Sequence, residues 1–222
     1  IIPAFSVGRT QLLTYCLAER MESGEIPDVP VVVDSPLAVA SSDVYRRHTE
    51  CFDDETWQFI AEHRHSALDF NNLIYTRTVD ESKALNDFHE PMIIISASGM
   101  AEAGRILHHL KNNIEDGRNT IMIISWQAPY TLGRRLADRE RKVRIFGEEY
   151  YRKAEVATIG GLSAHGGQKI LTDYALASKG TLKKIILVHG EDDAATALRA
   201  KLAEHQGVPE IIYPKKMDVL EI

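Results

Sequence analysis

Short apolar runs alternate along the chain with amphipathic stretches. The apolar runs predict seven strands, at Val29–Val33, Met92–Ile95, Ile121–Ile124, Val143–Phe146, Ala154–Ile159, Ile185–Val188 and Ile211–Tyr213. Most of these runs are continuously apolar, which is typical of strands buried on both faces of a parallel sheet. Between the runs, apolar residues recur every three or four positions and predict helices, as at Leu12–Met21, Leu107–Ile114 and Ala195–Leu202. The pattern therefore predicts an α/β fold with a largely parallel sheet.

Two segments depart from this simple alternation. Residues from about 37 to 88 read as a helical excursion, with the acidic turns Asp53-Asp54 and Asp80-Glu81 as candidate N-caps. Residues 134–144 are strongly basic, with Asp138 and Glu140 set against a cluster formed by Arg134, Arg135, Arg139, Arg141, Lys142 and Arg144. This shift to a basic composition predicts a domain boundary near residue 142, which divides the chain into domains 1–142 and 143–222.

Composition narrows the class of protein. The chain has 222 residues, of which 44% are hydrophobic and 26% charged, so one or two packed domains are expected. A net charge of −6 argues against a simple nucleic-acid coat protein but allows a local basic cleft. Only Cys16 and Cys51 are present, which excludes a disulfide scaffold and a cysteine-rich zinc module. With neither a signal peptide nor a membrane-spanning run, we expect a cytoplasmic protein without a membrane partner.

Polar residues follow several of the predicted strands, where ligands bind in open α/β sheets. Asp34 follows the first strand and either caps the next helix or has a functional role. Ser98-Gly99 forms an ordinary turn or, with Arg105, a phosphate-binding helix entrance. His189 follows another strand and is equally compatible with a core histidine. His165 lies between glycines, which leave its imidazole accessible.

Other motifs carry less information. His63-Arg64-His65 resembles a metal-binding pair, but Ala67 and Leu68 stand where further ligands are needed, so we interpret it as a solvated helix face. His108 and His109 lie on an amphipathic helix, where a structural role or a substrate contact is more expected than metal ligation. The chain contains neither the phosphate-binding loop of P-loop NTPases nor the nucleophile elbow of serine hydrolases.

Taken in order, the polar segments resemble the β-CASP branch of the metallo-β-lactamase superfamily. The segments that carry the resemblance are Pro3–Gln11, Asp34-Ser35-Pro36, Ser98–Met100, Gly104-Arg105, His108–Leu110, Ser163–His165 and Val188–Glu191. This branch contains ribonuclease J and the endonuclease of messenger-RNA 3′-end processing. The resemblance implies a parallel-sheet β-CASP domain over 1–142, with helices on both faces of the sheet. It also implies that 143–222 are the C-terminal part of a metallo-β-lactamase αββα domain.

The resemblance also implies roles for particular residues. Asp34 matches the acidic residue of motif A, and His165 matches the motif B histidine, proposed to give a proton to the leaving oxygen. His189 matches motif C, a ligand of one of two zinc ions, and histidine at this position favours RNA over DNA. Contacts with the substrate phosphates are expected from four residues, namely Ser98, Gly99, Arg105 and Arg9. The arginines of 134–144 are either further contacts with the RNA backbone or a solvated charged helix.

One departure from the family is large. The histidine-x-histidine-x-aspartate-histidine motif that supplies most zinc ligands is absent from these 222 residues. A catalytic zinc needs about three protein ligands, so His189 alone cannot hold one. Because the chain also begins at Ile1 rather than at methionine, we expect a C-terminal piece of a longer enzyme, without bound zinc and inactive alone.

The expected parent enzyme is a zinc-dependent ribonuclease, a hydrolase of RNA phosphodiester bonds in RNA processing or decay. Two alternatives remain open. The first is a non-catalytic RNA-binding or scaffold member of the family, although intact His165 and His189 argue against it. The second is a hydrolase of another phosphodiester. The sequence also leaves open endonuclease or exonuclease action, the RNA preference, and whether the protein forms a homodimer.

Overall fold

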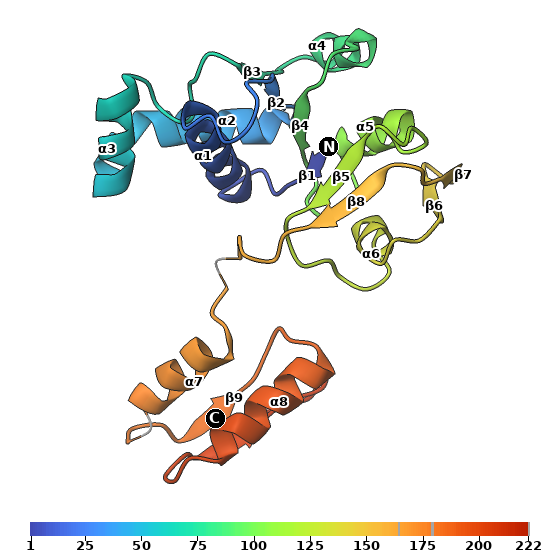
Figure 1. The fold of residues 1–222 in the computed structure, drawn as a ribbon. Coiled ribbons are helices and arrows are strands. Elements are labelled where there is room, and N and C mark those ends of the chain that lie inside the picture. The colour runs from blue at the N-terminus through green and yellow to red at the C-terminus, as the bar shows by residue number, and fades with distance from the viewer. Residues whose placement is uncertain (164, 179, 222) are drawn as a thin grey trace. The chain divides into compact units, whose positions relative to one another are not determined.

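The structure is a computed structural model that describes residues 1–163, 165–178 and 180–221. The chain divides into two compact units, Ile1–Ser163 and Ala164–Ile222. Both units contain parallel strands and helices (Figure 1), so the predicted α/β class is confirmed. Within the described ranges, no helix combines the length and apolar character needed to cross a membrane.

The first unit is built on parallel strands in the order β1-β4-β2-β3. These strands are β1 (Ile2–Pro3), β4 (Ile93–Ser96), β2 (Val31–Val33) and β3 (Leu73–Tyr75). Next to them, β5 (Thr120–Ile123) pairs in parallel with β8 (Glu155–Thr158). Ile1 N donates to Thr120 O and Met122 N donates to Ile1 O, at 2.7 and 2.9 Å, which is the bonding pattern of parallel neighbours. β5 therefore lies beside β1, and the carboxyl ends of all these strands meet at one edge.

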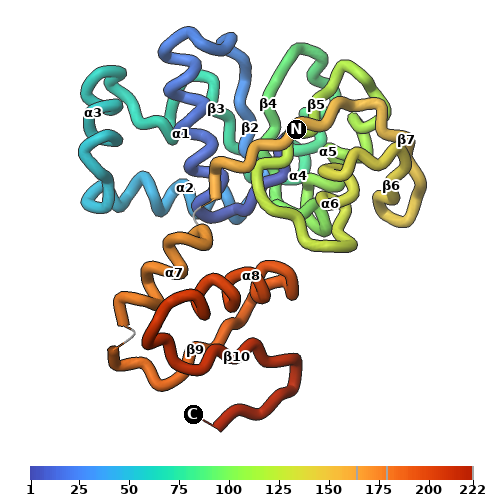
Figure 2. Tube along the Cα trace, turned by 60° about the horizontal axis from the view of Figure 1, so that its bottom comes forward, coloured from blue at the N-terminus to red at the C-terminus, as the bar shows by residue number. Residues whose placement is uncertain are grey.

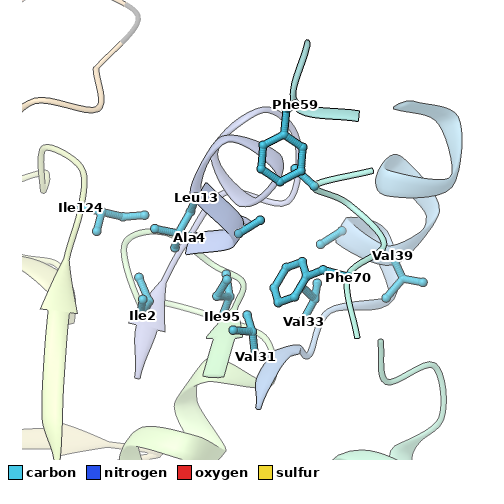
Figure 3. Close-up of a cluster of buried hydrophobic side chains, with 13 residues drawn as sticks. Ile2, Ala4, Leu13, Val31, Val33, Val39, Phe59, Phe70, Ile95 and Ile124 are labelled. Atoms are coloured by element: carbon cyan, nitrogen blue, oxygen red, sulfur yellow. The ribbon is translucent and has the colours of Figure 1, made fainter. Parts of the chain in front are cut away.

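Two hydrophobic clusters cover the two faces of this sheet. Successive side chains of a strand point to opposite faces, and in β5 Ile121 and Ile123 belong to one cluster while the following Ile124 belongs to the other. The cluster around Ile124 packs against α1 (Arg9–Glu22), α2 (Pro36–Arg47) and α3 (Asp54–His63), and Figure 3 shows its side chains. The cluster around Ile121 packs against α5 (Ile106–Asn113) and α6 (Leu132–Ala137). Helices thus lie on both faces, as predicted.

Three further strands occur in the described part of the chain. The first of these is β1, at Ile2–Pro3. β3 lies inside the segment 37–88, which we expected to be a helical excursion; that expectation is wrong for Leu73–Tyr75, because pairing with β2 draws this short run into the sheet. β7 (Glu148–Tyr151) is polar and pairs antiparallel with β6 (Lys142–Ile145). The turn between them, Phe146-Gly147, has φ values of 52° and 83°, typical of a tight hairpin.

Of the two acidic turns in 37–88 that were predicted to cap helices, one is confirmed as a cap and the other is wrong. Asp53 caps α3, since its carboxylate accepts a hydrogen bond from Thr56 N at 2.9 Å. The second acidic turn does not begin its helix. Thr78 caps α4 (Val79–Ala84), and Glu81 closes a reciprocal capping box. A threonine hydroxyl and a glutamate three residues later satisfy two backbone N–H groups at once, which Asp80 inside the helix does not. The 3₁₀ turns Thr49–Cys51 and Leu85–Asp87 complete this region.

The second unit contains α7 (Gln168–Ala177), β9 (Lys184–Ile186), α8 (Asp192–Ala203) and β10 (Glu210–Ile212). β9 and β10 pair in parallel, with Ile185 opposite Ile211. The two helices gather around this ladder (Figure 2), and Leu202 of α8 is fully buried. The predicted boundary near residue 142, between the β-CASP domain and the metallo-β-lactamase segment, stays a prediction. The compact unit continues to Ser163 because β8 is paired with β5.

Candidate functional site

Asp34 lies directly after β2 and is completely buried. Its backbone N–H donates to Ile95 O at 2.9 Å, and its carbonyl accepts from the Ser96 hydroxyl at 2.7 Å, so the residue is fixed to the end of β4. The interpretation of Asp34 as a helix cap is wrong, because the neighbouring Ser35 caps α2 by accepting from Ala38 N at 3.3 Å. The Asp34 carboxylate is therefore available for other partners.

Four side chains donate to that carboxylate. Ser82 Oγ and His109 Nε2 lie 2.6 and 2.5 Å from Oδ2, and Arg105 Nη1 lies 2.7 Å from Oδ1. Thr76 Oγ1 also donates to Oδ1. We call these five residues the Asp34 cluster. Burial raises the pKa of the carboxyl, but the hydrogen bonds from His109, Ser82, Thr76 and Arg105 together hold that pKa well below its usual range. Asp34 is therefore ionised at neutral pH.

The Asp34 cluster joins segments that are far apart in sequence. Thr76 follows β3, Ser82 belongs to α4, Arg105 precedes α5 and His109 lies within it. His109 is 2% exposed, which agrees with the structural role expected for this histidine. Because the carboxylate does not reach the surface, Asp34 acts on its surroundings through Arg105 and His109. Its catalytic role stays a prediction.

The loop after β4 is shaped by its glycines and serine. Ser98 Oγ accepts from Glu102 N and Ala103 N at 3.1 and 3.3 Å, which closes a turn. Gly99 packs against Phe5, where a Cβ would lie 3.0 Å from the ring. Gly104 has φ +87°, and a Cβ there would lie 2.5 Å from Ala97 O. The geometry shows how this loop is held, while phosphate contact by Ser98 and Gly99 stays a prediction.

The two arginines predicted to contact phosphate differ in their surroundings. The Arg105 guanidinium donates to Asp34 and, at 3.3 Å, to Arg77 O, so part of its hydrogen-bonding capacity is already used. Arg9 is the first residue of α1, after Gly8, whose φ is 77°. Within the described ranges, Nη1 of Arg9 is buried without a hydrogen-bond partner. A buried donor of this kind favours an acceptor from a ligand.

The two candidate histidines belong to the second unit, where both are exposed. His189 follows β9 and has φ 59°, in the left-handed region that histidine enters more readily than bulky apolar residues. The Tyr213 hydroxyl lies 3.1 Å from Gly190 O and 2.9 Å from Asp192 Oδ1, so it fixes the loop that carries His189. His165 and Asp34 belong to different units, and the catalytic role expected for His165 stays a prediction.

No group of three histidine, cysteine, aspartate or glutamate side chains in 1–163, 165–178 and 180–221 is placed to hold a metal ion. The described residues therefore do not provide a complete zinc site by themselves. His63 and His65 are engaged otherwise. His63 stacks on the buried Phe59 at 4.4 Å between ring centres, and His65 Nε2 lies 2.9 Å from Glu22. They are half-buried rather than a fully solvated face, because Phe59 offers an apolar surface.

Trp126 and Gln127 follow β5 at the same edge of the sheet and are candidate residues that the sequence motifs did not indicate. They line a cavity of about 420 Å³ together with residues from β5, α6, β8 and the segment after β8. The rule applied to the other strand ends, that polar groups after a buried apolar run deserve a functional test, would have found them. The arginine cluster begins beside this cavity, where Arg134 pairs with Asp138 at 2.9 Å.

The chain was compared with known proteins. Residues 10–136 match the family profile described as Beta-Casp domain, and residues 149–214 match the profile described as Zn-dependent metallo-hydrolase RNA specificity domain. Ribonuclease TTHA0252 of Thermus thermophilus is 34% identical over 91% of this chain and 46% of its own length. Transcription termination factor FttA of Pyrococcus horikoshii is 31% identical over 90% of this chain and 32% of its own. FttA of Methanosarcina mazei is 25% identical over 91% of this chain and 32% of its own length.

The chain thus spans about half or less of the length of these curated relatives. The order of the two profiles agrees with the order of the segments that carried the resemblance in the sequence. Since the first profile alone covers more than half of the chain, the protein belongs to the β-CASP branch of the metallo-β-lactamase superfamily.

Proposed function

We propose that this chain is part of a zinc-dependent ribonuclease that hydrolyses RNA phosphodiester bonds in RNA processing or decay. The observation that carries the proposal is the tandem match, a Beta-Casp domain followed by a domain described as the RNA specificity domain of Zn-dependent metallo-hydrolases. The name of the relative from Thermus thermophilus, a ribonuclease, supports the same reaction. Because the chain covers less than half of that relative, the activity belongs to the proposal for the whole protein.

In this proposal, His165 gives a proton to the ribose oxygen that leaves when the P–O bond breaks. Its exposure, between glycines, suits contact with a substrate. His189 is one zinc ligand, and other segments of the whole protein supply the remaining ligands. Asp34 is a positioning residue, because its buried carboxylate holds the strand-end segments together through four donors. Zinc, when bound, would supply an activated water and polarise the scissile phosphate.

Arg9 is the residue of this chain best placed to contact a substrate phosphate. Its buried Nη1 lacks a partner in the described structure, and it opens α1 at a helix end without a side-chain cap. A phosphate oxygen would satisfy this donor. Arg105 contributes less to such a contact, because Asp34 and Arg77 already accept hydrogen bonds from it.

Two variants of the whole protein test the assigned roles. We expect His165→Ala to lower single-turnover RNA cleavage by about 10²–10⁴-fold with normal zinc content, as for loss of a general acid. We expect His189→Ala to lower both zinc content and cleavage, because it removes a metal ligand. Unchanged cleavage per folded molecule in both variants would contradict the proposal. Loss of zinc in His165→Ala alone would reverse the two roles.

The names of the termination factors among the relatives do not specify cleavage, which leaves an RNA-binding role without cleavage as a second candidate. Labelled RNA that binds the zinc-loaded whole protein and stays intact would support this candidate. As part of the main proposal, we expect the isolated chain to be inactive. We also propose a cytoplasmic location, which suits the free thiols of Cys16 and Cys51.

A further inference from the structure

The segment after β5 presents a tryptophan to solvent in a fixed position. Trp126 is 59% exposed, whereas the next residue, Gln127, is 3% exposed. The Gln127 side-chain amide donates to Gly99 O at 3.0 Å and to Ser125 O at 3.1 Å. These bonds tie the loop after β5 to the loop after β4. A large apolar ring beside such an anchor can contact a ligand with little loss of conformational entropy.

The helix that follows makes the anchor tighter. A Cβ on Gly133 of α6 would lie 1.8 Å from Gln127 Oε1 and 2.9 Å from Met100 O. The Gln127 amide is therefore packed directly against the α6 backbone. In the described part of the chain, Oε1 is buried without a hydrogen-bond partner, so hydrogen bonds from Nε2 and packing against Gly133 fix the orientation of Gln127. Gln127 is accordingly a positioning residue for Trp126.

A cavity of about 420 Å³ opens beside this segment, within the range of about 300–1,000 Å³ usual for ligand pockets. Trp126 and Gln127 line it together with apolar side chains, which are Ile123, Ile124, Ala137 and Ile159. Polar groups come from Ser125, Thr158, Arg134 and Asp138. Next to it on α6, Arg135 is exposed and belongs to the basic cluster of 134–144. The cavity therefore combines a flat aromatic ring, an apolar wall and positive charge close by.

This combination is the chemistry that binds unpaired nucleobases, since single-stranded nucleic acid is held by aromatic stacking and by basic groups along its backbone. We propose that Trp126 and this cavity form a stacking subsite for one unpaired base of single-stranded RNA. The inference rests on the proposed function for its substrate class, and goes beyond it by naming the residue that holds a base. Because every base has a flat face, the subsite has little sequence preference.

The position of the subsite connects it with the predicted phosphate contacts. Gln127 Nε2 is bonded to the carbonyl of Gly99, one of the residues predicted to face a phosphate. Both loops lie at the carboxyl edge of the same parallel strands. The proposed base subsite and the predicted phosphate contacts at Ser98 and Gly99 therefore lie along the same edge of the sheet.

The test uses the tryptophan itself as the probe. The chain contains only Trp57 and Trp126, so Trp57→Phe leaves Trp126 as the sole indole. We expect its fluorescence to be quenched by a short single-stranded oligouridylate, and not by an abasic oligonucleotide of the same length and charge. In the otherwise unchanged chain, Trp126→Ala should weaken oligouridylate binding by about 5- to 150-fold, the usual contribution of one stacked base. Trp126→Phe should restore most of the affinity, because a phenyl ring also stacks.

Trp57→Ala is the matched control. Trp57 is 47% exposed on α3, far along the chain from the cavity, and its replacement should leave affinity unchanged. Equal quenching by the abasic oligonucleotide, or unchanged affinity in Trp126→Ala, would overturn the subsite and leave the proposed function intact. A complete lack of RNA binding by chain and whole protein alike would overturn both. The quenching arm keeps native Trp126, so the test holds even where an alanine variant folds poorly.

Discussion

The imidazole of His109 lies 2.5 Å from the carboxylate of Asp34, and both side chains are buried. The pair joins the end of β2 to the middle of α5, two elements that the sequence separates widely. Arg105, one turn before His109, donates to the other carboxylate oxygen. The Asp34 cluster therefore fixes the carboxyl edge of the sheet, where the candidate phosphate contacts and the proposed base subsite also lie.

Replacing Asp34 should destabilise the first unit strongly. We expect Asp34→Ala to lower the free energy of unfolding by about 3–5 kcal/mol, because it leaves the buried His109 and the half-buried Arg105 without their shared acceptor. Denaturant titration followed by circular dichroism measures the change. Asp43→Asn is the control, since Asp43 pairs with Arg46 and Arg77 nearer the surface and its pairs contribute about 0–1 kcal/mol. Equal losses of unfolding free energy in the two variants would show that the Asp34 cluster stabilises the fold no more than a surface ion pair does.

Stability should fall in acid through the same carboxylate. The pKa of Asp34 in the folded protein lies below its ordinary value of 3.8, so the unfolded chain binds the proton more readily. The stabilisation is then fully present above that value and is lost as the pH falls below it. Thermal melts from neutral pH down to about pH 2 should show a loss that begins below pH 3.8 and that Asp34→Asn reduces. An identical pH profile in that variant would contradict the assignment.

A methyl group on Gly133 should damage the anchor of Trp126. Alanine normally favours a helix over glycine by about 1 kcal/mol, but here its Cβ would collide with the Gln127 amide. We expect Gly133→Ala to cost about 1–3 kcal/mol of unfolding free energy through overpacking. Gly160→Ala is the matched control, because a Cβ there meets nothing within 4 Å.

The double variant Gly133→Ala/Gln127→Ala isolates the contact between the two residues. Removing the amide makes room for the new methyl group, so the double variant should lose less stability than the sum of its single variants. Strict additivity would place the strain of Gly133→Ala elsewhere, for example at Met100 O.

Removing the Tyr213 hydroxyl should loosen the loop that carries His189. Tyr213→Phe loses the contacts with Gly190 O and Asp192 Oδ1, yet the site is exposed, so the melting temperature should change little. In the whole protein, we expect zinc affinity to fall by about 10-fold or more, the usual effect of losing a group that orients a metal-binding residue. Zinc titration against a chromophoric chelator measures it. Unchanged affinity would mean that His189 does not depend on this loop for its position.

Much of the fold can be predicted from the sequence, because the apolar patterns that indicate strands and helices are local. Continuous apolar runs such as Val31–Val33 can be buried only in a sheet covered on both faces, and each predicted strand is present. Local sequence signals do not predict a strand that forms only because it pairs with another strand. Leu73–Tyr75 becomes a strand only beside β2, and the polar Glu148–Tyr151 only by folding back on β6. The motif order likewise identified the family, since each motif is a short, ordered segment.

The partners of the candidate residues were decided by the tertiary structure. The sequence singled out Asp34 by its place after a strand, but no local pattern links it to Thr76, Ser82, Arg105 and His109. A buried carboxylate collects whatever donors the folded chain brings within hydrogen-bond reach, and these come from two distant stretches of the chain, one with Thr76 and Ser82 and one with Arg105 and His109. Trp126 is a parallel case. Its exposure and its cavity arise only when β5, β8 and α6 have packed together. The sequence by itself determined the elements and the family, and packing determined which side chains meet, because contacts between distant segments depend on how the elements are arranged.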